Sequence, residues 1–251
     1  MNLFIADLHL SRAQPLLLDL FERFLHEIAP RAERLWILGD LFEYWAGDDD
    51  IDDPCNARVC RALAGAAGRG LNIVFLPGNR DFLCGPGFAR AAGLELLQEP
   101  QILRCGNTRW LIQHGDRLCT DDVEYQRFRA MVREDAWQAQ FLARPLAERR
   151  TIIGEVRNRS DAEKKHKPAA IMDVNAEAVA SAMRAAGATH MLHGHTHRAA
   201  RHLFTLDGRP AERWVLSDWT DHACWIELDA AGARAAMAGP AGPARADPRY
   251  R

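Results

Sequence analysis

The chain has 251 residues, of which 48% are hydrophobic and 26% are charged, and its formal net charge is −2. These values lie close to those of ordinary globular proteins and leave ample apolar material for a core, in one large domain or two small ones. A charge so close to zero excludes a global electrostatic field that attracts nucleic acid or anionic lipid. Any such attraction must come from a local patch.

The six cysteines are scattered, and none of them belongs to a C-x-x-C pair. This pattern favours reduced thiols in a cytosolic protein over a disulfide framework or a structural zinc site. The residues after Met1 lack the basic and apolar segments of a signal peptide. No apolar run approaches the roughly 20 residues that cross a bilayer. We therefore expect a cytosolic protein that at most lies on a membrane surface.

Short apolar runs of strand length recur along the chain, and two helical patterns, over residues 15–28 and 57–69, separate the early ones. This alternation predicts an α/β fold whose strands are buried on both faces. The strand-like runs cover residues 3–6, 35–38, 72–76, 110–113, 190–192 and 214–216.

One stretch, from about residue 121 to residue 183, has helical periodicity and no convincing strand. We interpret it as a helical cap inserted into the α/β core. Residues 230–251 are rich in Ala, Gly, Pro and Arg without periodicity, which is typical of a disordered tail. The expected organisation is a domain over residues 1–229, including the cap, followed by a tail over residues 230–251.

Five of the strand-like runs lead directly into residue types that bind metals. Sites in open α/β sheets form beyond the carboxyl ends of the strands, so blocks far apart in sequence can converge there. The blocks are Asp7-x-His9, Gly39-Asp40, Gly78-Asn79-Arg80-Asp81, His114-Gly115-Asp116 and Gly194-His195-Thr196-His197.

The spacing inside these blocks also suits a metal. Residues i and i+2 of an extended chain point to the same side, so Asp7 and His9 can grip one ion between them. The same holds for His195 and His197. A carboxylate such as Asp40 has two oxygens and can bridge two ions. Nitrogen and oxygen ligands together suit Mn, Fe or Zn better than Ca.

Taken alone, each block is also compatible with an ordinary turn or helix cap, and only the five in this order argue for a metal centre. Asp81 and Asp116 are interpreted as partners that orient the ligands, and His193 as a structural residue. The acidic run over residues 48–53 lacks the glycine and the final glutamate of a calcium-binding EF-hand loop. We expect a solvated loop there.

The order D-x-H, G-D, G-N-x-D, H and G-H-x-H resembles the calcineurin-like metallophosphoesterases. The resemblance implies an α/β sandwich of two β-sheets flanked by helices, here with a helical cap. It also implies two ions, about 3.5–4 Å apart, that activate a hydroxide for in-line attack on a phosphoester. One ion would be held by Asp7, His9, Asp40 and His197, and the other by Asp40, Asn79, His114 and His195. The catalytic residues would be Asp40, Asn79, Arg80, His114 and His195.

Further blocks indicate a subfamily. They begin at Gly39, Gly78, His114 and Ala170 and read G-D-L-F-E-x-W, G-N-R-D-F-L, H-G-D-x-L-C-T-D-D and A-I-M-D-V-N. From residue 3 to about residue 202 the chain resembles the UDP-2,3-diacylglucosamine diphosphatases of Gram-negative lipid A synthesis. This implies cleavage of a pyrophosphate bond to UMP and the acylated sugar 1-phosphate. The implied cofactors are two Mn²⁺ ions, with Mg²⁺ or another divalent ion as the alternative.

The resemblance also implies a set of substrate contacts, half of them in the cap. Position 164 departs from the family pattern, since the better-known members have Asn where this chain has Lys164, and we keep it as a candidate contact. The cap's basic cluster suits a diphosphate, although a solvated charged face would look the same. Its apolar stripes could line an acyl-chain groove, but we expect most of them to pack the cap on the body. The implied contacts are Asn79, Arg80, Asp122, Ser160, Lys167 and His195.

Two rival classes stay open. A protein phosphatase of this fold has Asp-Arg-Gly where this chain reads Leu41-Phe42-Glu43, and a nuclease would have a broader basic surface. A binding module on an inactive scaffold would have lost ligands, and none is missing. We expect no nucleic acid and infer no protein partner. Peripheral contact with the cytoplasmic side of the inner membrane is expected, through apolar residues near Arg144, Arg149 and Arg150.

Overall fold

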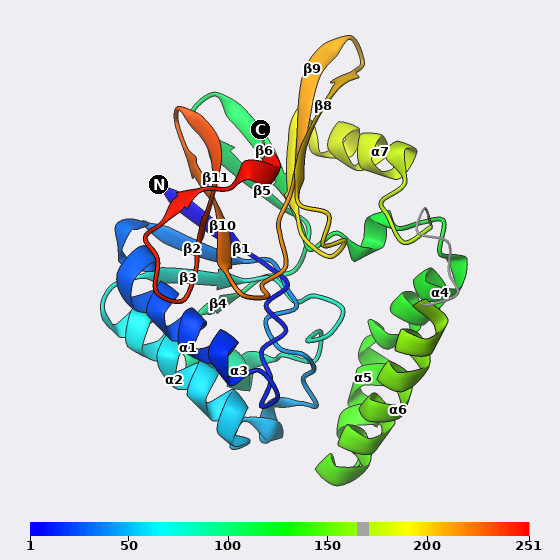
Figure 1. Cartoon of the computed structure of the whole chain (residues 1–251). Coiled ribbons are helices and arrows are strands. Elements are labelled where there is room, and N and C mark those ends of the chain that lie inside the picture. The colour runs from blue at the N-terminus through cyan, green and yellow to red at the C-terminus, as the bar shows by residue number, and fades with distance from the viewer. Residues whose placement is uncertain (165–170, 251) are drawn as a thin grey trace.

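Two β-sheets face each other in the computed structural model of the chain, which describes residues 1–164 and 171–250, without the side chains of residues 161, 163 and 164 (Figure 1). The first sheet contains, in spatial order, β12 (Arg245–Ala246), β11 (Gly232–Ala238), β10 (Ala223–Asp229), β1 (Asn2–Ile5), β2 (Arg34–Ile37), β3 (Asn72–Phe75) and β4 (Glu95–Leu96). The second contains β5 (Gln101–Cys105), β6 (Thr108–Ile112), β7 (His190–His193), β9 (Arg209–Val215) and β8 (Ala200–Leu206).

Helices cover the outer faces of both sheets (Figure 1). The first sheet carries α1 (Pro15–Arg23), a π-helical turn over Phe24–Ile28, α2 (Pro54–Gly68) and α3 (Pro86–Ala92). The second carries α7 (Ala176–Ala186). The predicted α/β sandwich of two sheets flanked by helices is therefore confirmed.

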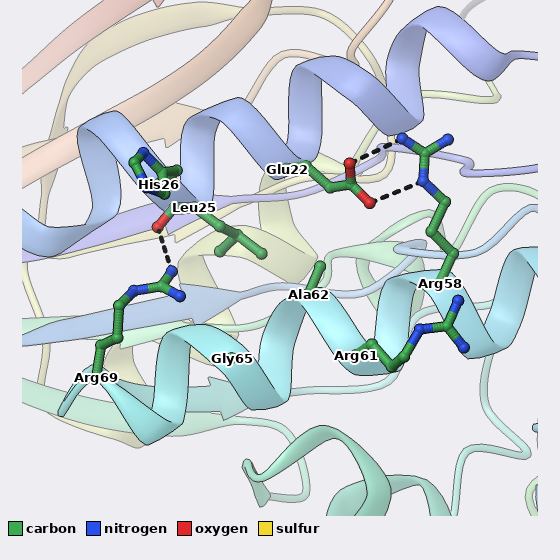
Figure 2. A pocket seen from close by; sticks show the side chains of 8 residues that line it. All are labelled: Glu22, Leu25, His26, Arg58, Arg61, Ala62, Gly65 and Arg69. Atoms are coloured by element: carbon green, nitrogen blue, oxygen red, sulfur yellow. Dashed lines mark hydrogen bonds and ion pairs between the residues drawn. The ribbon is translucent and has the colours of Figure 1, made fainter.

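Ion pairs connect the helices α1 and α2. The guanidinium of Arg58 on α2 lies 2.7 Å from a Glu22 carboxylate oxygen and 2.6 Å from one of Asp19, both on α1. Figure 2 shows the Arg58–Glu22 pair at one end of a cavity of about 450 Å³ between these helices. None of the residues that line this cavity belongs to the five metal-binding blocks. It is a feature of the helical layer.

The central strands are buried on both faces, as the continuous apolar runs predicted. Leu3 and Ile5 belong to the cluster that includes the helices of the first sheet. Phe4 lies in the cluster between the two sheets, with Trp36 of β2 and Trp110 of β6. Because side chains alternate along a strand, successive residues of β1 stabilise the two layers in turn. Burying an aliphatic or aromatic side chain of this size contributes about 1.5–3 kcal/mol.

All six predicted strand runs are confirmed, as β1, β2, β3, β6, β7 and the end of β9. The strands that were not foreseen are β4, β5, β8, β10, β11 and β12. Three of the confirmed strands, β1 to β3, run parallel side by side. In the second sheet, β7 lies parallel to both β6 and β9. The carboxyl ends of β1, β2 and β3 therefore share one edge of their sheet, and those of β6 and β7 share one edge of theirs.

The predicted cap range divides into two parts. The helices α4 (Val123–Val132), α5 (Asp135–Leu142) and α6 (Leu146–Lys164) form a group at the side of the sandwich (Figure 1). In contrast, α7 packs Val179 and Met183 against Met191 of the second sheet and so belongs to the core. The described residues between 121 and 183 contain no strand, as expected.

The acidic run is a docking site for the cap, and the expectation of a solvated loop is wrong. Asp50 is 1% exposed and forms an ion pair with Arg150 of α6. Arg149, also 1% exposed, pairs with Asp49 and donates to a main-chain carbonyl. The carboxylate of Asp48 accepts the main-chain N–H of Gly85, just before α3, at 2.9 Å, and that of Gly87, within α3, at 2.6 Å. A buried Arg149 cannot flank a membrane-facing surface, which corrects that expectation too.

The predicted disordered tail is also wrong. β11 pairs with β10 along its full length, and β12 pairs with β11. Beyond them the Tyr250 ring stacks on Trp214, with 5.6 Å between ring centroids, and its hydroxyl donates to the carbonyl of Val215. Pairing with an existing strand satisfies the main-chain groups of β11, which overrides the weak strand propensity of its alanines.

Candidate metal centre

Five loops bring the seven predicted ligands together, although the ligands span most of the chain. Each loop follows a strand whose buried residues fix where it begins. The first three leave β1, β2 and β3 of the first sheet, and the other two leave β6 and β7 of the second. In chain order these loops carry Asp7 and His9, then Asp40, then Asn79, then His114, and finally His195 and His197.

Five of these residues have a left-handed backbone, which non-glycine residues adopt rarely. Such conformations cost about 1–3 kcal/mol each and persist where the surroundings enforce them, often at functional sites. They are Asp7 (φ 56°), His9 (φ 49°), Asp40 (φ 52°), His195 (φ 68°) and His197 (φ 56°). Their gathering on one set of loops marks the region as functional independently of the motifs.

The first group of ligands consists of His9, His197, Asp7 and one oxygen of Asp40. The Nε2 atoms of His9 and His197 lie 3.2 Å apart. The Nε2 atom of His197 is 3.6 Å from Asp7 Oδ1, and that of His9 is 4.0 Å from Asp40 Oδ2. Atoms that bind one ion at about 2.0–2.2 Å lie about 3–3.5 Å from one another. Asp7, His9 and His197 each offer a ligand atom within 4.8 Å of the others, and Asp40 lies at the border of this group.

The second group lies on the other side of Asp40. His114 Nε2 is 2.9 Å from Asn79 Oδ1 and 3.7 Å from Asp40 Oδ1. The ring of His195 meets that of His114 edge-on, with 5.1 Å between centroids. Since Oδ1 of Asp40 faces this group and Oδ2 faces His9, its carboxylate lies between two sets of ligands.

The donor set fits divalent cations. Asp7, Asp40 and His114 are almost fully buried, and Asp7 Oδ1 has no hydrogen-bond partner among the described residues. A buried carboxylate oxygen without a partner is costly unless a cation binds it. Burial alone would raise the pKa of Asp7, but the imidazoles of His197, His114 and His9 outweigh burial and lower that pKa to about 2. The site is therefore built to keep this carboxylate ionised.

Two glycines make room for these carboxylates. A Cβ atom on Gly78 would lie 2.3 Å from Asp40 Oδ1, and one on Gly194 would lie 2.4 Å from Asp7 Oδ2. Both distances are far shorter than van der Waals contact. The glycines of the G-N-R-D and G-H-T-H blocks are thus required by close approach of main chain to ligand.

Asp81 holds the ligand loops, as a partner of the ligands was expected to do. Its buried carboxylate accepts N–H bonds from Gly78 at 2.7 Å, Leu41 at 2.7 Å and Asp40 at 3.2 Å. Burial, followed by the charge of Asp40, raises the pKa of Asp81 to about 6. Asp81 therefore connects the loop after β2 with the loop after β3.

Asp116 connects the site to the cap. Its Oδ2 atom accepts from the Tyr125 hydroxyl at 2.6 Å and from Arg129 Nε at 2.8 Å, both on α4. The Tyr125 ring stacks on His195, with 6.1 Å between centroids. Arg129 also pairs with Glu99, which accepts the main-chain N–H of His114. Helix α4 thus contacts the second ligand group directly.

Comparison with known proteins supplies the family. The calcineurin-like phosphoesterase model matches residues 3–199. A UDP-2,3-diacylglucosamine hydrolase of Aromatoleum aromaticum is 50% identical over 235 residues, which are 94% of this chain and 96% of that protein. Proteins of the same name from Chromohalobacter salexigens and Bordetella pertussis are each 45% identical, over 91% and 90% of this chain and 94% and 91% of their own. The chain belongs to the UDP-2,3-diacylglucosamine hydrolase family.

As a member of this family the chain is a metal-dependent hydrolase. The residues that the family pattern assigns to substrate lie at two places. Asn79 and Arg80 stand at the second ligand group, where Arg80 N donates to Asp40 Oδ1 at 2.8 Å. Asp122 is the N-cap of α4, and Ser160 is a half-buried residue of α6. The side chain of Lys164 and the whole of Lys167 lie outside the described residues.

Sequence reasoning missed three polar residues at the hydrolase site. Glu43 Oε2 lies 3.4 Å from His9 Nδ1, and Asp218 Oδ2 lies 3.5 Å from His197 Nδ1. Tyr125 covers His195. Glu43 belongs to the G-D-L-F-E-x-W block and could have been found there, whereas Asp218 and Tyr125 carry no motif of their own among the ligand blocks. His193 is buried and bonded to Arg213 at 3.0 Å, as a structural residue would be.

Proposed function

We propose that this hydrolase cleaves the pyrophosphate bond of UDP-2,3-diacylglucosamine to UMP and 2,3-diacylglucosamine 1-phosphate (lipid X) in lipid A biosynthesis. The observation that carries the proposal is the likeness, over 94% of the chain, to a protein named for this substrate. The matched region includes the cap, which catalysis by the metal centre alone would not need. The match over the insertion, together with the ligand blocks, supports the proposed substrate.

Two divalent ions, Mn²⁺ first among them, are the proposed cofactors. Asp7, His9, Asp40 and His197 would hold one, and Asp40, Asn79, His114 and His195 the other. Bound there, the ions supply Lewis acidity to the phosphoryl oxygens and lower the pKa of a water molecule that attacks phosphorus. The grouping of donors on either side of Asp40 supports this arrangement.

The chain's own cations orient the diphosphate. Arg80 lies beside the ligands, with its guanidinium 3.4 Å from Glu43, and a phosphate can replace that carboxylate as its partner. Ser160 follows Arg157 by three residues on α6, so both lie on one face of the helix. Since Arg157 reaches Glu43, this face of the cap looks towards the metal centre. We assign Asn79, Arg80, Asp122, Ser160, Lys164, Lys167 and His195 to substrate binding.

The acyl chains need an apolar surface, and the cap offers one. Phe128 and Met131 of α4 are 36% and 44% exposed, and Val156 of α6 is 40% exposed. In the described part of the chain, no helix has the length and apolarity that crossing a bilayer requires. We propose that the enzyme works at the cytoplasmic face of the inner membrane through peripheral contact, and takes its lipid substrate from there.

The direct test is product analysis. Purified protein with Mn²⁺ is incubated with UDP-2,3-diacylglucosamine, and the products are separated by mass. UMP together with the acylated sugar 1-phosphate is the expected pair. Release of UDP would place the cleavage at another bond, and hydrolysis of generic phosphodiesters without action on the lipid nucleotide would indicate a different phosphoesterase of this family.

A further inference from the structure

Glu43 lies between the proposed metal centre and the cap. It is neither a proposed metal ligand nor a proposed substrate contact. Its side chain is 21% exposed. The Oε2 atom lies 3.4 Å from His9 Nδ1, and Oε1 pairs with Arg157 of α6 and lies 3.4 Å from Arg80. One carboxylate therefore touches a proposed ligand, a proposed substrate contact and the cap.

The contact with His9 has a specific chemical meaning. A neutral imidazole that binds an ion through Nε2 carries its proton on Nδ1, and an acceptor behind Nδ1 fixes that tautomer and the ring orientation. His9 Nε2 faces His197 and Asp40, while the buried Nδ1 atom has no other partner in the described part of the chain. At 3.4 Å the contact is slightly longer than the usual hydrogen bond of about 2.7–3.2 Å. A small ring movement closes it.

The contact with Arg157 brings in the cap. Arg157 is 114 residues away in sequence, and its ion pair with Glu43 connects α6 to the loop after β2. Arg150 with Asp50 is a cap–body ion pair that involves no residue in contact with a proposed ligand. Arg129 of α4 pairs with Glu99, which accepts the main-chain N–H of His114, but that contact lies at the second ligand group and not at His9.

We propose that Glu43 is a positioning residue that holds His9 in its metal-binding orientation and is itself held by Arg157, so that the position of the cap sets the affinity of the ion at His9. The inference rests on the proposed metal centre. By linkage the coupling is reciprocal: filling the site at His9 stabilises the seating of α6 by the same free energy.

The test measures Mn²⁺ binding by titration calorimetry on the full chain, with no substrate present. Glu43→Ala removes the acceptor, and loss of such a partner typically weakens metal binding about 10–100-fold, here for one of two ions. Glu43→Gln keeps an oxygen that can accept from Nδ1 but cannot pair with Arg157, so it should retain more affinity than Glu43→Ala. Arg157→Ala should weaken the same ion at least about fivefold, a usual lower limit for coupled sites.

Two controls separate positioning from a merely structural role. Arg150→Ala breaks a different cap–body ion pair and should leave Mn²⁺ affinity unchanged. In the Glu43→Gln background, Arg157→Ala should have no further effect, because the ion pair through which it acts is already absent. Thermal melts without metal identify any variant that fails to fold, and Glu43→Gln, nearly isosteric with the native side chain, keeps the test valid if Glu43→Ala is one of them.

The outcomes distinguish this inference from the function on which it rests. Wild-type protein that binds no Mn²⁺ would overturn the metal centre and the inference together. Wild-type protein that binds two ions, with Glu43→Ala and Glu43→Gln binding both equally well, would overturn the inference alone. An equal loss of affinity in Arg150→Ala, or an Arg157→Ala effect that persists without Glu43, would mean that cap docking in general acts on the site.

Discussion

The two carboxylate oxygens of Asp40 face the two groups of proposed ligands, Oδ2 towards His9 and Oδ1 towards His114. We predict that Asp40→Ala abolishes activity and lowers the metal content to one ion per chain or none, because each site loses a ligand. His197→Ala should disturb mainly one site, since its Nε2 atom lies only with the first group. Elemental analysis of purified variants measures both effects. Two tightly held ions in Asp40→Ala would refute the bridging assignment.

Arg80 occupies a position where many metallophosphoesterases have a histidine that protonates the leaving group. A guanidinium does not deprotonate in proteins and cannot act as an acid. A phosphate leaves a pyrophosphate bond as a stable anion, so a fixed cation is more useful there than a proton donor, which would otherwise contribute about 10²–10⁴-fold. We predict fast cleavage of pyrophosphates and acidic aryl esters and slow cleavage of alkyl phosphodiesters.

A series of phosphodiesters with graded leaving-group pKa measures this prediction as the slope of log rate against pKa. Arg80→His should slow hydrolysis of the lipid nucleotide without tightening its binding, and it provides the matched comparison. A flat dependence in the wild-type protein would mean that another residue donates the proton, and the argument would then fail.

Among single residues, the proposed metal ligands could be predicted from the sequence, but not all of the residues that contact them could. The ligands stand in short blocks directly after buried strands, so local pattern and strand ends together identify them. Asp218 lies 3.5 Å from the Nδ1 atom of His197, and no sequence block marks it as a partner of that imidazole. A lone acidic residue in a loop has many ordinary explanations, and only the three-dimensional contact with a ring nitrogen selects one of them.

Helix α6 is anchored to the body by a buried cation. Arg149 donates to the carbonyl of Ala46 and to Asp49, and its side chain is only 2% exposed. Arg149→Ala leaves a void and unpaired polar groups, so we expect a loss of about 3 kcal/mol in the free energy of unfolding. Arg144→Ala, which breaks an exposed pair with Glu148, should cost less than about 1 kcal/mol. Urea titration followed by circular dichroism compares the two, and equal losses would contradict the anchoring role.

The cap as a substrate-binding element is tested through Ser160. Removing a hydroxyl that bonds to a charged group costs about 1.5–3 kcal/mol, and each 1.36 kcal/mol corresponds to about tenfold in rate. We therefore expect Ser160→Ala to lower kcat/KM for the lipid nucleotide about 10–100-fold with metal content unchanged. Hydrolysis of a small aryl phosphodiester, which needs no cap, should fall far less. Equal losses on both substrates would make Ser160 a structural residue.

The strands differ in how well local sequence predicts them. The runs that became β1, β2 and β3 are apolar throughout because layers cover both faces, and such runs are recognisable locally. β11 reads G-A-R-A-A-M-A, and nothing in that composition favours a strand over a coil. Its structure comes from its neighbour β10, a partner that sequence pattern alone does not identify.

The last residues of the chain stabilise the molecule as a whole. Arg249 donates to Ser217 at 2.6 Å and pairs with Asp247, and the Tyr250 ring covers Trp214. We predict that deleting residues 241–251 lowers the melting temperature by about 5–10 °C, since roughly 2–3 kcal/mol of contacts are lost and each kcal/mol shifts a domain of this size by about 2–4 °C. Calorimetric scans of both lengths at equal concentration measure it. An unchanged midpoint would show these contacts to be energetically neutral.

The order of strands in the first sheet also constrains how the protein can be made. β1 lies between β2 and β10, so during synthesis it must wait for residues 223–229 before its second edge is paired. During synthesis the apolar β1 remains an open edge, which is the kind of surface that templates aggregation. Chains stalled before residue 223 should therefore depend on chaperones, and productive folding of the first sheet should begin only after residues 223–229 have been synthesised.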